Sequence, residues 1–215
     1  MSTTGQGSSR FALLAVVLCC IITVALAVGA FWQNGVASSK VDDAEGYESS
    51  AALFRQAEGE GQQAGTLLQE YVATGDATLI PQINEHTSAG VTSLTAAIQE
   101  SGIDGTAFIE GGSQLVQGEG QIIALRQAGD VQSAIAGLQQ LSTQFEEFLA
   151  VQTAVITSQD AAAVTARDDA ETADALTSWM VIGAAVFAIG AAASGILHIR
   201  RTSSRRRTLD ALPSA

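Results

Sequence analysis

The sequence predicts an all-α protein in which two transmembrane helices flank an extracytoplasmic, antiparallel up-down-up-down four-helix bundle. Three observations predict this class: two long uncharged apolar stretches, a helical spacing of apolar residues between them, and short glycine-containing breaks in that spacing. Apolar residues make up 47% of the 215 residues and aromatic residues only 5%. This composition favours helices packed through small side chains over a sheet with a large aromatic core.

The two apolar stretches are long enough to cross a bilayer. Residues 11–31 carry no charge over 21 positions, and residues 179–197 carry none over 19. A hydrocarbon core of about 30 Å needs about 20 apolar residues in a helix. We therefore expect transmembrane helices at 11–31 and 179–198, with the lipid bilayer as a partner and Trp179 as an interfacial anchor.

The distribution of charge predicts the orientation. Arg10 precedes the first stretch, and five arginines follow the second, whereas residues 32–178 hold 21 acidic against four basic residues. Loops rich in lysine and arginine stay in the cytoplasm. We therefore expect a cytoplasmic N-terminus at 1–10, a cytoplasmic basic tail at 199–215, and residues 32–178 outside a bacterial-type cytoplasmic membrane. The net charge of −12 also disfavours nucleic acid as a partner.

A cleaved signal peptide is the rival interpretation of the N-terminus. The tripeptide at residues 28–30, Val-Gly-Ala, fits a cleavage site. The apolar stretch is longer than the roughly 7 to 15 residues of a typical signal peptide, which favours retention. Cys19 and Cys20 lie inside this stretch and, as neighbours on a helix, cannot form a disulfide with each other.

Between the spans, four helical runs are separated by three short breaks. The breaks read "TGD" at 74–76, "SGIDG" at 101–105 and "AGD" at 128–130. Glycine enters the left-handed conformation that ends a helix, and an aspartate after it can cap the next helix. We therefore predict helix turns at Gly75–Asp76 and at Gly129–Asp130. Because the first and fourth runs join the spans, both turns are expected at the membrane-distal tip.

The predicted helix contacts are weak in two places. Gln152, Gln159 and Asp169 occupy buried positions of the fourth run, and glycines at 59, 61 and 65 weaken the first by about 1 kcal/mol each relative to alanine. Such helices gain stability by pairing with a second copy, so we expect a homodimer. In the second span, small residues at four-residue spacing predict close packing of membrane helices: Gly190 with Ser194, and Ala191 with Gly195.

This arrangement resembles the four-helix-bundle sensor domain of methyl-accepting chemotaxis receptors. The resemblance covers about residues 11–198, and it rests on the string Leu67–Asp76, which contains "YVATGD", and on the turn around Gly129 and Asp130. Such receptors continue into a linker module and a cytoplasmic signalling hairpin, whereas 17 residues follow His198 here. The resemblance therefore implies a sensor that signals through a partner: a membrane receptor, a kinase or a larger membrane complex.

Motifs for catalysis and metal binding are absent from the sequence. No nucleophile elbow, phosphate-binding loop, zinc-protease motif or dinucleotide fingerprint occurs. His86 stands beside a single glutamate, and a metal site needs several convergent ligands. We predict no enzyme activity, no catalytic residue, no metal and no cofactor, and an exposed helix position for His86.

Three arginines of the outer segment, Arg55, Arg126 and Arg167, are the candidate ligand-binding residues. Their guanidinium groups could bind an anionic ligand such as a carboxylate. The competing interpretation is ordinary ion pairing with the abundant acidic residues, and it is favoured because exposed ion pairs are common.

The function that follows is a membrane-anchored, chemoreceptor-like sensor that binds a small ligand or partner outside the membrane. It would signal through another membrane protein. The alternative is a non-catalytic structural or accessory subunit of a membrane protein complex. A secreted bundle released by signal cleavage is the third.

Overall fold

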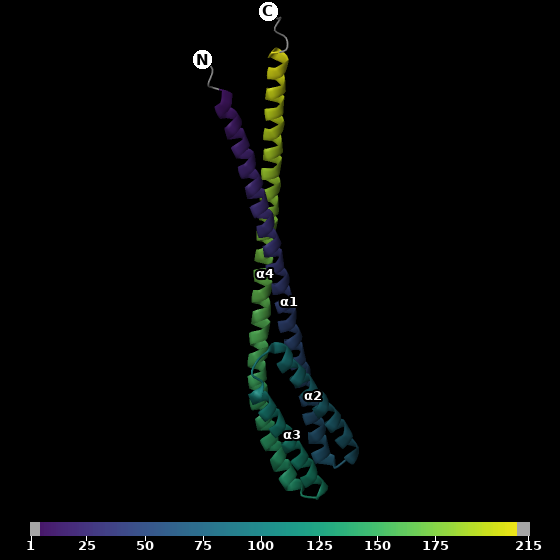
Figure 1. Ribbon diagram of the computed structural model, residues 1–215. Helices are drawn as coiled ribbons and strands as arrows, with labels where there is room; N and C mark the ends of the chain where they lie inside the picture. Colours follow the sequence, from purple (N-terminus) through teal and green to yellow (C-terminus); the bar gives the residue numbers. More distant parts are fainter. Residues whose placement is uncertain (1–4, 210–215) are drawn as a thin grey trace, which may run out of the picture. The chain divides into compact units, whose positions relative to one another are not determined.

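The computed structural model describes the backbone of residues 5–209 and the side chains of residues 17–194 and Ile196. The described chain is 95% helical and has no strands, which confirms the predicted all-α class. The predicted cytoplasmic ends, 1–10 and 199–215, lie outside the described side chains. Four α-helices and one short 3-10 helix follow one another (Figure 1): α1 (Gly5–Thr74), η1 (Ala77–Leu79), α2 (Ile80–Ser101), α3 (Thr106–Gln127) and α4 (Val131–Leu209).

Glycines in the left-handed region stand where α1, α2 and α3 end. The φ angles are 76° at Gly75, 64° at Gly102 and 82° at Gly129, and no other described residue has a positive φ. A side chain would crowd the backbone in this conformation, which is why glycine ends helices so often. The Gly75 amide donates to the Tyr71 carbonyl at 2.7 Å and so satisfies one of the last acceptors of α1.

The aspartate of each Gly-Asp turn caps the helix that follows it. Asp76 accepts the backbone amide of Thr78 at 2.9 Å, and Asp130 accepts that of Ser133 at 3.1 Å. Hydrogen bonds from the side chain and the backbone of Thr78, and likewise of Ser133, hold the pKa of both carboxyl groups below the usual value. These bonds satisfy amides that have no partner within the helix.

The chain divides into two compact units. The central unit is Val41–Arg167, and the terminal unit combines Met1–Lys40 with Asp168–Ala215. Helices α1 and α4 contribute residues to both units, whereas α2 and α3 belong to the central unit alone.

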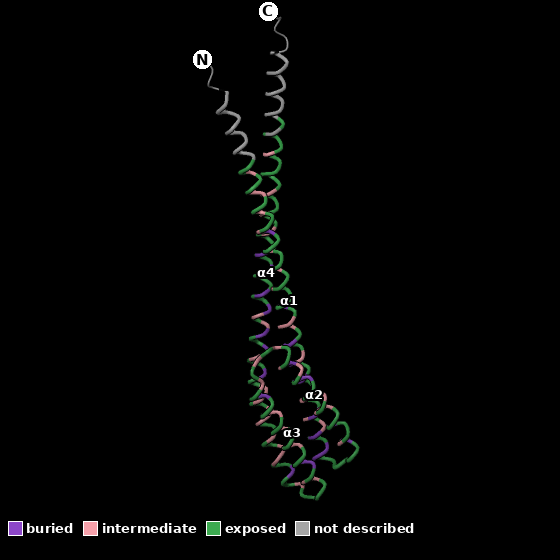
Figure 2. Tube along the Cα trace, in the orientation of Figure 1, coloured by how far each residue is buried: buried purple, intermediate pink, exposed green. Residues whose placement is uncertain are grey.

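The core of the central unit consists of two apolar clusters, and each receives side chains from all four α-helices. One cluster is built around Leu68, Ile83 and Ile122, and the other around Phe54, Leu94 and Phe108. The ring centroids of Phe54 and Phe108 are 5.5 Å apart, a favourable separation for aromatic pairs. Figure 2 shows the buried positions recurring along the inner faces of these helices.

Buried positions on α4 follow the predicted spacing only in part. Gln152 and Gln159 are buried as expected, with exposures of 1% and 7%. Asp169 is exposed instead, and its carboxylate lies 4.0 Å from the ammonium group of Lys40 in the terminal unit. Ala170, one position later than the predicted Asp169, is buried in its place. Burying the methyl of an alanine avoids the cost of burying the Asp169 charge.

Two helices, α1 and α4, are long and apolar enough to cross a membrane. In the terminal unit many of their large apolar side chains are exposed. Phe31 and Trp32 on α1 are 84% and 75% exposed, and Trp179 on α4 is 72% exposed. An exposed apolar surface of this kind is compatible with contact with membrane lipid.

Within the terminal unit, α1 and α4 contact each other at glycines other than those predicted. A Cβ built on Gly29 would lie 3.1 Å from the sulfur of Met180, and one on Gly183 would lie 3.4 Å from Leu26. Of the predicted packing residues, Gly190 and Ser194 are exposed and Ala191 is half-buried, whereas the burial of Gly195 is outside what the structure describes. Their role in helix packing stays a prediction.

Candidate functional site

Each of the three candidate arginines has a partner within the protein, and the three are not brought together. Arg55 pairs with Asp160 at 2.5 Å, and Arg167 pairs with Glu48 at 2.5 Å. Along α1 the three contacts lie at Glu48, Arg55 and Val72, and Glu48 is about 36 Å from Val72 along the helix at 1.5 Å per residue. The structure thus places them in three separate contacts, and the predicted anion site stays a prediction.

Arg126 has a structural position at the end of α1. Its Nε donates to the carbonyl oxygen of Val72 at 2.9 Å, one of the last carbonyls of that helix. A guanidinium group at a helix C-terminus also complements the negative end of the helix dipole. Arg126 of α3 therefore holds the turn that contains Gly75.

The central unit contains an apolar cavity of about 150 Å³. All four α-helices line it. Its larger apolar residues are Leu68, Val91, Leu94, Leu115, Val116, Leu138, Leu141, Phe145 and Phe148. Its polar residues are Gln69, Thr87, Glu119 and Ser142.

Small residues create this cavity. Gly61 and Gly65 of α1, Gly90 of α2 and Gly112 of α3 all line it. A Cβ on Gly65 would meet nothing within 4 Å, whereas one on Gly61 would lie 3.0 Å from the Phe145 ring. Glycine at these positions leaves space where a leucine would fill the core.

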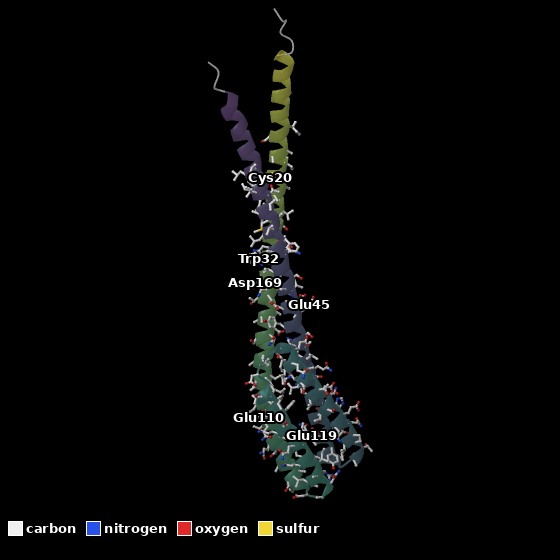
Figure 3. The ribbon with its side chains drawn as sticks, in the orientation of Figure 1. Cys20, Trp32, Glu45, Glu110, Glu119 and Asp169 are labelled. Atoms are coloured by element: carbon white, nitrogen blue, oxygen red, sulfur yellow. The ribbon has the colours of Figure 1, made fainter. Side chains whose placement is uncertain are left out.

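Glu119 is the only charged residue that lines the cavity among the described residues. It lies on α3 (labelled in Figure 3), and its Oε2 accepts a hydrogen bond from Thr87 Oγ1 of α2 at 2.8 Å. Burial raises the pKa of the Glu119 carboxyl, and the Thr87 hydrogen bond lowers it by less. A partly desolvated carboxylate therefore faces an apolar space without a positively charged partner beside it.

The cavity adjoins a groove between α2 and α3. Thr87, Val91, Val116 and Glu119 line both spaces. The carboxylate of Glu119 therefore borders both the apolar cavity and the groove.

Sequence reasoning missed this cavity and its carboxylate. It treated Gly61 and Gly65 only as weak points of a helix. One signal was available: Glu119 is four residues after Leu115 and three before Ile122, so helical spacing places it on the apolar face. A charge on such a face indicates either a paired residue or a functional one.

His86 is half-buried, whereas the sequence predicted an exposed position. Its Nδ1 lies 2.7 Å from Oε2 of Glu60, which brings α2 and α1 together. Across the described residues, no group of three or more metal-ligating side chains converges.

Comparison of the chain with protein-family models, with curated proteins and with solved structures finds no match.

Proposed function

We propose that this chain is a membrane-anchored, chemoreceptor-like sensor. Its central unit binds a small ligand outside the membrane, and it signals through another membrane protein. The observation that carries the proposal is the apolar cavity with a carboxylate in its wall, because a concave apolar space with few polar groups is typical of ligand sites.

The proposed membrane location is supported by the apolar surfaces of α1 and α4 in the terminal unit. The proposed orientation is supported by charge alone: five arginines follow the second apolar stretch, and acidic residues dominate the segment between the two stretches. Both termini would then lie in the cytoplasm and the central unit outside.

The proposed antiparallel up-down-up-down bundle is supported by contacts between α1 and α4. Glu48 pairs with Arg167 and Arg55 with Asp160, and Gly61 lies against Phe145. Partner numbers on α4 fall as those on α1 rise, as expected for two helices that run in opposite directions. The short turns at Gly75 and Gly129 then reverse the chain into α2 and into α4.

The sensor role is supported by the resemblance of the Leu67–Asp76 string, and of the second Gly-Asp turn, to chemotaxis receptor sensor domains. Helix α4 is helical from the cavity-lining residues into the apolar stretch at 179–197. A ligand that changes the packing around Leu138, Leu141 or Phe145 would therefore act on the helix that enters the membrane.

Co-purification from gently solubilised membranes tests this proposal. A sensor that signals through a partner is expected to be recovered with a receptor or a kinase. Stoichiometric recovery with a large enzyme complex, and with no signalling protein, would overturn the proposal in favour of an accessory subunit.

A further inference from the structure

The volume of the cavity, its apolar lining and the carboxylate in its wall together indicate one chemical class of ligand. We infer that it binds a small organic cation: an apolar body of about one aromatic ring that bears a protonated amine, with the amine at Glu119. This inference deepens the proposed sensor function and rests on it for its biological meaning. The binding itself can be measured separately.

Size sets the apolar body. A cavity of about 150 Å³ with aliphatic and aromatic walls is large enough for one benzene ring. Leu68, Leu94, Leu115, Leu138 and Phe145 provide such walls. Burial of apolar surface is favourable in rough proportion to its area, so a ring of six carbons gains much of its affinity from burial alone.

Charge sets the polar group. Among the described residues, no lysine, arginine or histidine lines the cavity, and Glu119 receives one hydrogen bond, from Thr87. A carboxylate in an apolar wall is costly unless it is paired. A protonated amine would supply the missing positive charge through a charge-assisted hydrogen bond. A carboxylate ligand would instead place two like charges together.

The surrounding charge favours the same ligand. Residues 41–167 hold 17 acidic and three basic side chains, and those three basic side chains already have partners. The negative electrostatic potential of such a surface raises the local concentration of cations and speeds their association. Glu119 lines both the cavity and the groove, so an amine can approach it from the groove.

Benzylamine, benzyl alcohol and benzoate form a probe set with one ring and a positive, neutral or negative group. The full chain is reconstituted in phosphatidylcholine nanodiscs, and binding is measured by calorimetric titration with empty nanodiscs as the blank. We expect saturable binding of benzylamine, weaker binding of benzyl alcohol and no binding of benzoate.

Two pairs of variants test the position of the ligand. Glu119→Gln removes the charge, and Glu110→Gln removes the charge of an exposed glutamate on the same helix. Gly65→Leu fills the cavity, and Gly59→Leu makes the same change at an exposed position with open space around it. Both leucine variants should gain helix stability, because leucine has a higher helix propensity than glycine.

We expect Glu119→Gln to weaken benzylamine binding about ten- to hundredfold, the loss typical of a hydrogen bond to a charged group. Gly65→Leu should abolish binding, and Glu110→Gln and Gly59→Leu should leave it unchanged. If Gly65→Leu does not fold, Gly112→Ala serves instead, because its Cβ would lie 3.7 Å from Leu94, an ordinary contact.

Three results would overturn the inference: no saturable binding of benzylamine, equal binding of benzoate, or undiminished affinity in Glu119→Gln. These results do not decide the sensor proposal, because a sensor that recognises another ligand would still be recovered with a signalling partner. Conversely, recovery with an enzyme complex would overturn the sensor role and leave the cation site to be decided by titration.

Discussion

Gly75 and Gly129 share a left-handed backbone but have different surroundings. A Cβ on Gly75 would lie 2.5 Å from the Arg126 guanidinium, whereas one on Gly129 would meet nothing within 4 Å. Their φ angles are 76° and 82°, so the conformational strain of an alanine is the same at both positions, about 1–2 kcal/mol. The difference between the two positions is therefore the displacement of Arg126.

We predict that Gly75→Ala lowers the free energy of unfolding more than Gly129→Ala does. Gly129→Ala should cost only the strain, whereas Gly75→Ala should also break the Arg126–Val72 hydrogen bond, worth about 1.5–3 kcal/mol for a charged donor. Thermal melting of the full chain, followed by circular dichroism, measures both. Equal losses in the two variants would mean that Arg126 does not hold the turn.

Glu119 makes stability depend on pH in a predictable direction. Burial raises its pKa in the folded protein above the unfolded value. The Glu119 carboxyl therefore binds a proton more tightly in the folded state than in the unfolded state. Its favourable contribution to the free energy of unfolding is fully present at pH values below the unfolded-state pKa. It is lost as pH rises through the folded-state pKa.

We predict that Glu119→Gln melts at a higher temperature than the wild type at neutral pH and that this difference shrinks as pH falls towards 4. Glutamine keeps the shape of the protonated side chain but never ionises. Melting temperatures measured from about pH 4 to 8, around the usual glutamate pKa, test this. Glu110→Gln is the control, and a difference that grows on acidification would contradict the prediction.

At the scale of single elements, the sequence was informative where local chemistry decides the outcome. A glycine in the left-handed conformation and an aspartate that accepts a nearby amide are short-range features, and "TGD" and "AGD" mark the ends of α1 and α3. The all-α class follows in the same way from helical spacing.

The cavity could not be predicted in this way, because it depends on residues from different helices. Gly61, Gly90 and Gly112 are each a minor helix weakness when they are taken alone, and only the packing of three helices brings them to one space. The burial of Ala170 instead of Asp169 was also beyond the reach of spacing alone, because helical spacing allows either residue to face the core. The free-energy cost of desolvating the Asp169 carboxylate favours the burial of Ala170.

Gln159 of α4 is buried with an unsatisfied side-chain oxygen. The residue is 7% exposed, and its Oε1 has no hydrogen-bond partner in the described structure. A buried polar group without a partner costs about 1–3 kcal/mol. Leucine has a similar volume and has no polar side-chain atom.

We therefore predict that Gln159→Leu raises the free energy of unfolding by about 1–3 kcal/mol, the cost of the unsatisfied group. Gln139→Leu, at an exposed position of the same helix, is the matched control and should change stability little. Melting of both variants beside the wild type measures the effect. A lower melting temperature for Gln159→Leu would show that the amide has a favourable partner.

At the scale of the whole molecule, the proposed topology makes a prediction about chemical access. The protein has two cysteines, Cys19 and Cys20, both in the first apolar stretch. A thiol in a bilayer is shielded from a membrane-impermeant maleimide, so the unmodified chain provides a background with little labelling. One further cysteine can then report on any chosen segment.

We predict that the maleimide labels Gln63→Cys, an exposed position of the central unit, in intact spheroplasts. Thr208→Cys in the basic tail should be labelled only after the membrane is opened, because the arginines around it favour the proposed cytoplasmic location of the tail. Labelling of Thr208→Cys in intact spheroplasts would contradict this orientation. The intact mass of the labelled protein also tests whether the N-terminal apolar stretch is retained. A mass without residues 1–30 would favour a cleaved signal peptide. A mass that includes both apolar stretches would favour a central unit anchored in the membrane at both of its ends.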